Sequence, residues 1–185
     1  RQRRGIVKDG LFKTILYTIL GIGIMTALMT LTSITTPIEG VYIQLAYGYL
    51  ALFAGVAGAI PAAIVGFTGH VLFDLIYTDH LWLSWALSTG ALGFVFGFAI
   101  RRKSLRQGVF SQHDMIRFNV VQAVVNIAIF GLIAPTLDVL FYQQSTTIVF
   151  TQGWIASIVN LLTVAVFGTI TLKLYANYKL KQNKQ

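Results

Sequence analysis

The longest apolar stretch of the chain, residues 41–77, restricts the possible fold more than any other feature. It consists of apolar, aromatic and small side chains, interrupted only by Gln44, Thr68, His70 and Asp74. A single bilayer crossing needs about 20 residues, so this stretch is too long for one membrane helix and slightly short for two. Gly55, Gly58 and Pro61 lie near its middle, where glycine and proline favour a turn. We therefore expect a tight membrane hairpin of two short helices.

The rest of the chain extends this hairpin to an all-α membrane bundle. Charged residues make up 11% of the sequence, against about 25% in soluble domains. We expect Pro135 to end the fifth helix, and the polar segment 136–152 to remain outside the bilayer with at most a short interfacial helix. The prediction is a single integral membrane domain, residues 1–185, with six transmembrane helices at about 11–33, 44–57, 61–77, 81–100, 118–134 and 153–175.

The positions of the basic residues give this bundle an orientation. All 14 Lys and Arg residues lie in three segments, 1–13, 101–117 and 173–184. With six helices these segments share one side of the membrane, which the positive-inside rule assigns to the cytoplasm. We therefore expect both termini to be cytoplasmic. The net charge of +8 follows from this topology, so no nucleic-acid partner is expected.

His70 and Asp74 are the sharpest candidate for a functional site. They lie four residues apart, on one face of a predicted membrane helix, where ionisable groups are expensive and usually functional. The pair could hold a polar ring or relay a proton, and a buried structural pair is the competing interpretation. The chain has no cysteine and no HExxH motif, so we expect no metal and no cofactor.

Uncharged polar residues on different helices share the depth of the outer membrane boundary. Their hydroxyl and amide groups suit a neutral heteroaromatic ligand, although each alone could equally form an interhelical hydrogen bond. Trp85 adds a flat apolar wall, and belt anchoring is its alternative role. We predict a substrate pocket that opens to the outside, is covered by the first and fifth loops, and is lined by Gln44, His70, Asp74, Ser84, Trp85, Asn126, Gln152 and Asn160.

Small residues recur at four-residue spacing, as in helix–helix contacts within membranes. In the first predicted helix they are Gly23 and Ala27. This face could pack inside the bundle or dock another membrane protein. The chain lacks a GxxxxGK[ST] motif, so it cannot bind ATP in a P-loop by itself.

Two sequence motifs carry a family resemblance. The run IQLAYGYLALFAGVAGAIPAAIVGFTGHVLFD at 43–74 contains GFxGHxxxD, and WLSW follows at 82–85. They resemble the membrane-embedded substrate-binding (S) components of energy-coupling factor (ECF) transporters, in the riboflavin or hydroxymethylpyrimidine branch. The resemblance implies that the chain captures a vitamin outside the cell, while a transmembrane coupling protein and two ATPases drive import. Relatives dock the coupling protein through two alanines four residues apart, a position that here holds Gly23 and Ala27.

These observations lead to a functional expectation. We expect a non-catalytic vitamin-capturing subunit of a bacterial plasma-membrane importer, with hydroxymethylpyrimidine or pyridoxine favoured and riboflavin as a further candidate. The region around the predicted pocket contains no Lys or Arg, which disfavours an anionic ligand. Two alternatives remain. One is a small intramembrane enzyme that uses His70 and Asp74 as acid and base, and the other is a self-sufficient secondary transporter.

Overall fold

The computed structural model describes the backbone of residues 2–185 and the side chains from Gly10 onward. Two two-residue strands, β1 (Ile34–Thr35) and β2 (Tyr42–Ile43), pair antiparallel, and the other regular elements of the described chain are helices. The helices are α1 (Gln2–Leu31), α2 (Ala46–Ala57), α3 (Ala59–Phe73), α4 (Leu83–Ala99), α5 (Arg102–Arg106), α6 (Gln112–Ala128), α7 (Ala134–Tyr142), α8 (Thr146–Thr163) and α9 (Thr169–Gln182).

Three π-helical turns join some of these helices into longer rods. They are η1 (Asp74–Thr78) after α3, η2 (Ile129–Ile133) between α6 and α7, and η3 (Val164–Gly168) between α8 and α9. Four helical segments of the described chain are long and apolar enough to cross a membrane: Gly10–Leu31, Ala59–Thr78, Gln112–Tyr142 and Thr146–Gln182. Two shorter apolar helices, α2 and α4, complete the bundle.

The hairpin expected in residues 41–77 breaks at Gly58. This glycine has φ +103°, a conformation that side chains with a Cβ rarely adopt, and it separates α2 from α3. Gln44 lies just before α2 rather than inside it. The second arm is a continuous helix from Ala59 to Thr78, so it is long enough to span by itself.

The predicted boundaries of the last two long helices are wrong. Pro135 does not end a helix, because the backbone continues through η2 into α7 as far as Tyr142. The π-helical turn before Pro135 changes the hydrogen-bond pattern at the point where proline lacks an N–H, which lets the rod continue. The following rod begins at Thr146 rather than near residue 153. Of the polar residues in segment 136–152, Asp138 is buried in the bundle and Gln144 and Gln152 line the cavity described below, whereas the others are mostly exposed.

The segment 101–117 is also more helical than expected. It contains α5, and α6 begins at Gln112. The Ser111 hydroxyl accepts a bond from the Asp114 backbone N–H, while the Asp114 carboxylate accepts from the Ser111 N–H. This capping box satisfies backbone donors at the helix start, and the apolar pattern of the sequence does not reveal it.

Close backbone approach holds α3 against α4. A Cβ added at Gly97 would lie 2.3 Å from the Cα of Ala59, and one added at Gly93 would lie 2.5 Å from the carbonyl oxygen of Ala62. Only glycine fits at such separations, so the small residues of α4 pack inside the bundle. Fully buried large side chains fill the remaining core, among them Met25, Leu50, Phe96, Phe118 and Phe130.

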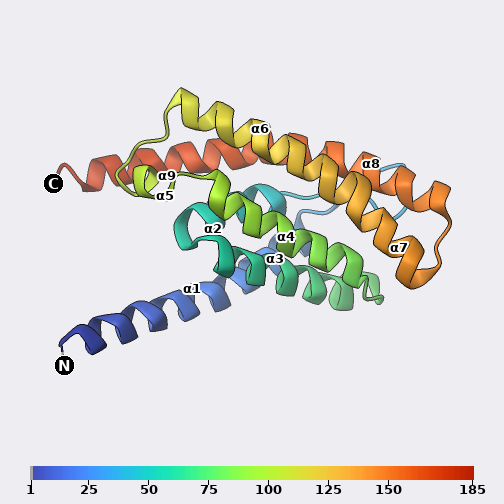
Figure 1. Ribbon diagram of the computed structural model, residues 1–185, viewed down its shortest axis with the longest axis horizontal. Coiled ribbons are helices and arrows are strands. Elements are labelled where there is room, and N and C mark those ends of the chain that lie inside the picture. Colours follow the sequence, from blue (N-terminus) through green and yellow to red (C-terminus); the bar gives the residue numbers. More distant parts are fainter. Residues whose placement is uncertain (1) are drawn as a thin grey trace.

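Figure 1 shows that the two ends of the bundle differ. The two termini lie at the same end as α5, while α7 and its connection to α8 lie at the opposite end. Arg102 and Arg106 each donate a hydrogen bond to the carbonyl oxygen of Val56, at the C-terminus of α2. Lys173 donates to the carbonyl oxygen of Phe110. Basic residues distant in sequence therefore contact the bundle at the end that holds the termini.

Candidate substrate pocket

A cavity of about 300 Å³ lies at the end of the bundle opposite the termini. The β1–β2 connection, the start of α2, the α3–η1 rod, the start of α4 and the α7–α8 region all contribute to its wall. Six of the eight side chains predicted as substrate-binding line it: Gln44, His70, Asp74, Trp85, Gln152 and Asn160. Their convergence follows from packing, because they come from four separate parts of the chain: the segment before α2, the α3–η1 rod, α4 and α8.

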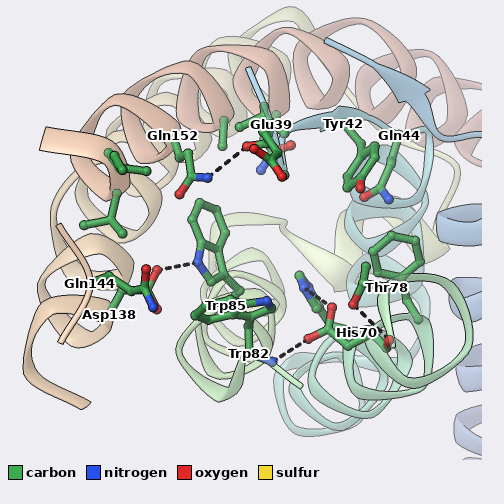
Figure 2. A pocket seen from close by; sticks show the side chains of 18 of the residues that line it. Glu39, Tyr42, Gln44, His70, Thr78, Trp82, Trp85, Asp138, Gln144 and Gln152 are labelled. Atoms are coloured by element: carbon green, nitrogen blue, oxygen red, sulfur yellow. Dashed lines mark hydrogen bonds and ion pairs between the residues drawn. The ribbon is translucent and has the colours of Figure 1, made fainter. Parts of the chain in front are cut away.

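His70 and Asp74 form a buried pair in the wall of this cavity. The His70 Nε2 lies 3.6 Å from Asp74 Oδ1, and its Nδ1 lies 2.7 Å from the hydroxyl of Thr89. The second oxygen of Asp74 accepts the backbone N–H of Trp82 at 2.9 Å. Figure 2 shows His70 and Trp82 at one side of the cavity. Contacts from α4 thus hold the imidazole and the carboxylate in place beside the cavity.

Asp138 is a pocket residue that was not predicted from the sequence. Its carboxylate is 1% exposed and accepts hydrogen bonds from the Ser84 hydroxyl and from the Trp85 Nε1, the latter at 2.7 Å. The sequence pattern predicts it in a segment outside the bilayer, 136–152, whereas it lies on α7. A signal was present, since an aspartate inside the apolar run DVLFY requires a partner if it is buried.

Two glutamine side chains form hydrogen bonds that hold the first loop, between α1 and α2, against the pocket. The Gln44 amide donates to the carbonyl oxygen of Met29 and to the Ser33 hydroxyl, both at the end of α1. The Gln152 amide donates to the carbonyl oxygen of Glu39 at 2.9 Å, which ties α8 to the β1–β2 connection (Figure 2). The first loop is therefore anchored over the cavity from two sides.

Ser84 and Asn126 do not line the cavity. Ser84 is fully buried behind it and bonds Asp138. Asn126 is also fully buried, and its amide donates to the backbone carbonyl and side-chain oxygen of Gln122. The Asn126 Oδ1 has no hydrogen-bond partner among the described residues. Both side chains therefore form hydrogen bonds within the bundle that surrounds the pocket, and neither forms part of the pocket surface.

Aromatic rings make up much of the apolar wall. Trp85 packs on Phe130 with ring centres 5.7 Å apart, and Phe130 also meets Tyr47 edge to face. Tyr42, on β2, packs edge to face on Phe73. Burial raises the pKa of the Tyr42 phenol, with smaller contributions from nearby acidic groups, so it remains a neutral hydrogen-bonding group. A planar ring would find stacking surfaces on more than one side.

The pocket lining contains acidic residues but no Lys or Arg among the described residues. The described lining residues include Glu39, Asp74 and Asp138, together with His70, and they include neither Lys nor Arg. An ionised carboxylate only accepts hydrogen bonds, so the cavity favours ligands that donate hydrogen bonds or carry positive charge. Among the described side chains, no group of three or more His, Cys, Asp and Glu residues could hold a metal ion.

The Gly23–Ala27 face lies away from the pocket and is uncovered. Both residues are exposed, and a Cβ added at Gly23 would meet nothing within 4 Å. By contrast, Met25 and Met29, on another face of the same helix, are fully buried. The described part of the chain therefore leaves the small-residue face of α1 exposed.

The fold and the cavity define a multi-pass membrane protein with a pocket of small-molecule size that is lined by both aromatic and polar side chains. The family model of the ECF-type riboflavin transporter S component matches residues 11–177. Curated relatives described as UPF0397 proteins include one from Lactococcus lactis subsp. cremoris strain SK11, 41% identical over 95% of this chain and 93% of its own. Others are from Enterococcus faecalis, 38% identical over 89% and 92%, and Lactobacillus acidophilus, 40% identical over 88% of each chain.

These comparisons establish the family. The chain belongs to the ECF-type riboflavin transporter S components, the family that includes the UPF0397 proteins. It is a multi-pass plasma-membrane protein and a transporter component, not an enzyme. No solved structure matches the chain.

Proposed function

We propose that this chain is the substrate-capture subunit of an ECF-type importer and binds a water-soluble vitamin or precursor in the 300 Å³ cavity. The favoured ligands are hydroxymethylpyrimidine and pyridoxine, with riboflavin as the alternative suggested by the name of the family. Gln44, His70, Asp74, Trp85, Gln152 and Asn160 contact the ligand, while Ser84 and Asn126 support them from behind.

The cavity itself is the observation that supports this choice of ligand. Its volume lies at the lower end of the roughly 300–1,000 Å³ range of small-molecule pockets, which favours a one-ring ligand over the three fused rings and ribityl chain of riboflavin. Asp138 already accepts from Ser84 and Trp85, so the hydroxyl and amino donors of a substituted pyrimidine or pyridine are suited to the carboxylates of Asp74 and Glu39. A ligand that lacks such donors leaves buried acceptors unpaired, which gives the pocket its selectivity.

The proposed topology places this pocket at the outer side of the membrane. We propose six crossings, with α2 and α4 as the two short ones, and with both termini in the cytoplasm. The distribution of Lys and Arg supports this orientation, because the loops around the pocket contain neither. The whole of residues 1–185 acts as one integral membrane domain.

Import requires partners that this chain does not supply. We propose that the exposed Gly23–Ala27 face docks a transmembrane coupling protein, which in turn carries two ATPase subunits. Small residues permit close approach of a partner helix in lipid, where packing rather than water release drives association.

Identification of the bound compound tests the proposal. The chain is purified with its partners absent, its small molecules are released by denaturation, and mass spectrometry identifies them. The released compound, hydroxymethylpyrimidine, pyridoxine and riboflavin are then titrated against the unmodified chain and against His70→Ala and Asn126→Ala variants. We expect saturable binding of a one-ring compound and weaker binding by His70→Ala.

Two results would contradict the proposal. If His70→Ala does not weaken binding of the released compound, the pocket assignment is wrong. If the chain alone catalyses counterflow of the ligand in proteoliposomes, it is a self-sufficient secondary transporter and needs no coupling protein.

A further inference from the structure

A second cavity, of about 610 Å³, lies between α1, α2, α5 and α9 at the end of the bundle that holds the termini. Its walls are apolar and include Leu20 and Ile24 from α1 and Leu52 and Phe53 from α2. The α1 side is open: Leu20 is 54% exposed and Ile24 is 48% exposed. In a membrane-spanning helix such exposed residues face lipid, so acyl chains have direct access to this groove.

One end of the groove is basic. Arg102 and Arg106 from α5 and Lys179 from α9 line it, and none of the lining residues that the structure describes is acidic. The ammonium group of Lys179 lies 5.7 Å from the ring centre of Tyr178 and 5.9 Å from that of Tyr175. The groove therefore combines an apolar wall with three cationic groups at one end.

Arg102 retains unused hydrogen-bonding capacity in this position. Its Nη2 and that of Arg106 bind the Val56 carbonyl oxygen, whereas the Arg102 Nε is buried without a hydrogen-bond partner among the described residues. Burial, followed by the adjacent charge of Arg106, lowers the pKa of Arg102. An anion at this end of the groove would accept from the free donors and offset the repulsion between the two guanidinium groups.

We infer that this groove binds one anionic phospholipid, with the phosphate at Arg102, Arg106 and Lys179 and an acyl chain along the α1–α2 wall. Basic pockets between transmembrane helices are suited to anionic headgroups of the cytoplasmic leaflet. The continuity of the apolar wall with the cationic end matches a lipid better than free phosphate, which has no use for the wall. The inference goes beyond vitamin capture and draws on the proposed topology only for the choice of leaflet.

Native mass spectrometry of the intact chain tests this inference. The protein is released from micelles that contain phosphatidylglycerol or phosphatidylcholine with identical acyl chains, with or without inorganic phosphate. We expect phosphatidylglycerol to be retained in preference to phosphatidylcholine, and phosphate to leave this retention unchanged. The double variant Arg106→Gln/Lys179→Gln should bind phosphatidylglycerol at least about fivefold more weakly.

A matched variant controls for charge alone. Arg117→Gln/Lys184→Gln removes the same charge from exposed residues outside the groove and should retain phosphatidylglycerol as the unmodified chain does. Arg102 is left intact so that the Val56 carbonyl oxygen, which Arg106 also binds, keeps one guanidinium donor, and the single variant Lys179→Gln serves if the double variant does not fold. Vitamin binding in the outer pocket confirms that each variant is folded, and it reports on the proposed function independently.

Three results would overturn the inference. Equal retention of the two lipids would show that the cationic end is not used. Displacement of phosphatidylglycerol by inorganic phosphate would show that the apolar wall contributes nothing. A double variant that keeps its lipid but no longer assembles with a coupling protein would assign the groove to a protein partner.

Discussion

The indole Nε1 of Trp85 donates a hydrogen bond of 2.7 Å to Oδ2 of Asp138, across 53 residues of sequence. This bond joins the start of α4 to α7 in the wall of the 300 Å³ cavity, which both side chains line. The orientation of the indole, and with it the shape of the cavity, therefore depends on a carboxylate from a different helix.

The first prediction concerns this bond. Trp85→Phe keeps an aromatic ring but leaves the buried Asp138 carboxylate with one donor fewer, which should lower the free energy of unfolding by about 1–3 kcal/mol. Denaturant unfolding in micelles measures the change. The control is Trp154→Phe, since that indole is 44% exposed. Equal stability of the two variants would mean that the Trp85–Asp138 bond contributes nothing.

A second prediction separates the structural role of Asp74, which accepts the Trp82 N–H, from its proposed role in ligand binding. Asp74→Asn retains an oxygen that can accept the Trp82 N–H but loses the negative charge beside the cavity. Stability should be close to that of the unmodified chain, while ligand affinity falls roughly tenfold or more, as expected for a hydrogen bond to a charged group. Isothermal titration with the released ligand measures the affinity. Asp79→Asn, in an exposed turn outside the cavity, should bind normally, and an equal loss there would refute a local effect.

Helix packing gives a third prediction. Gly97→Ala places a methyl group 2.3 Å from the Ala59 Cα, so α3 and α4 must separate, at a cost of about 1–3 kcal/mol. Gly23→Ala makes the same chemical change where nothing lies within 4 Å and should leave stability unchanged. Thermal unfolding of the two variants side by side provides the measurement. A stable Gly97→Ala variant would indicate a looser α3–α4 contact than the structure has.

The exposed face of α1 leads to a fourth prediction. The double variant Gly23→Leu/Ala27→Leu should still bind the vitamin, because neither residue lines the outer cavity. It should co-purify with the coupling protein at a much lower yield, because bulky side chains prevent close helix approach. The double variant Ile116→Leu/Val120→Leu is the control, because both residues are exposed on α6 and the substitutions keep that surface apolar. Normal assembly of the α1 variant would place the docking surface elsewhere.

The fifth prediction concerns topology, and the absence of cysteine makes it straightforward to test. The single variants His80→Cys and Ser145→Cys change exposed residues at the end of the bundle that holds the 300 Å³ cavity. Each should react with a membrane-impermeant maleimide added to intact cells. A cysteine at Gln107, exposed beside α5, should react only after the cells are opened. Labelling of all three positions from outside would exclude a six-crossing arrangement with cytoplasmic termini.

Much of the site could be identified from single residues, but not all of it. The His70–Asp74 pair was predicted because helical spacing alone places two such residues on one face, and the structure has their side chains 3.6 Å apart. Asp138 was missed because Pro135 suggested a helix end before it. Helix continuation there depends on a π-helical turn, and a search for uninterrupted α-helical periodicity does not detect such a turn.

The sequence by itself determined the kind of protein: an apolar helical bundle for the bilayer, with its basic residues in three segments and the motifs of its family. These are properties of consecutive residues, because bilayer thickness sets segment length and membrane charge asymmetry favours basic residues on one side. Only the tertiary structure decided which polar groups share a cavity. The Gln152 amide meets the carbonyl oxygen of Glu39 across 113 residues, a contact that arises from helix packing and loop closure rather than from any local pattern.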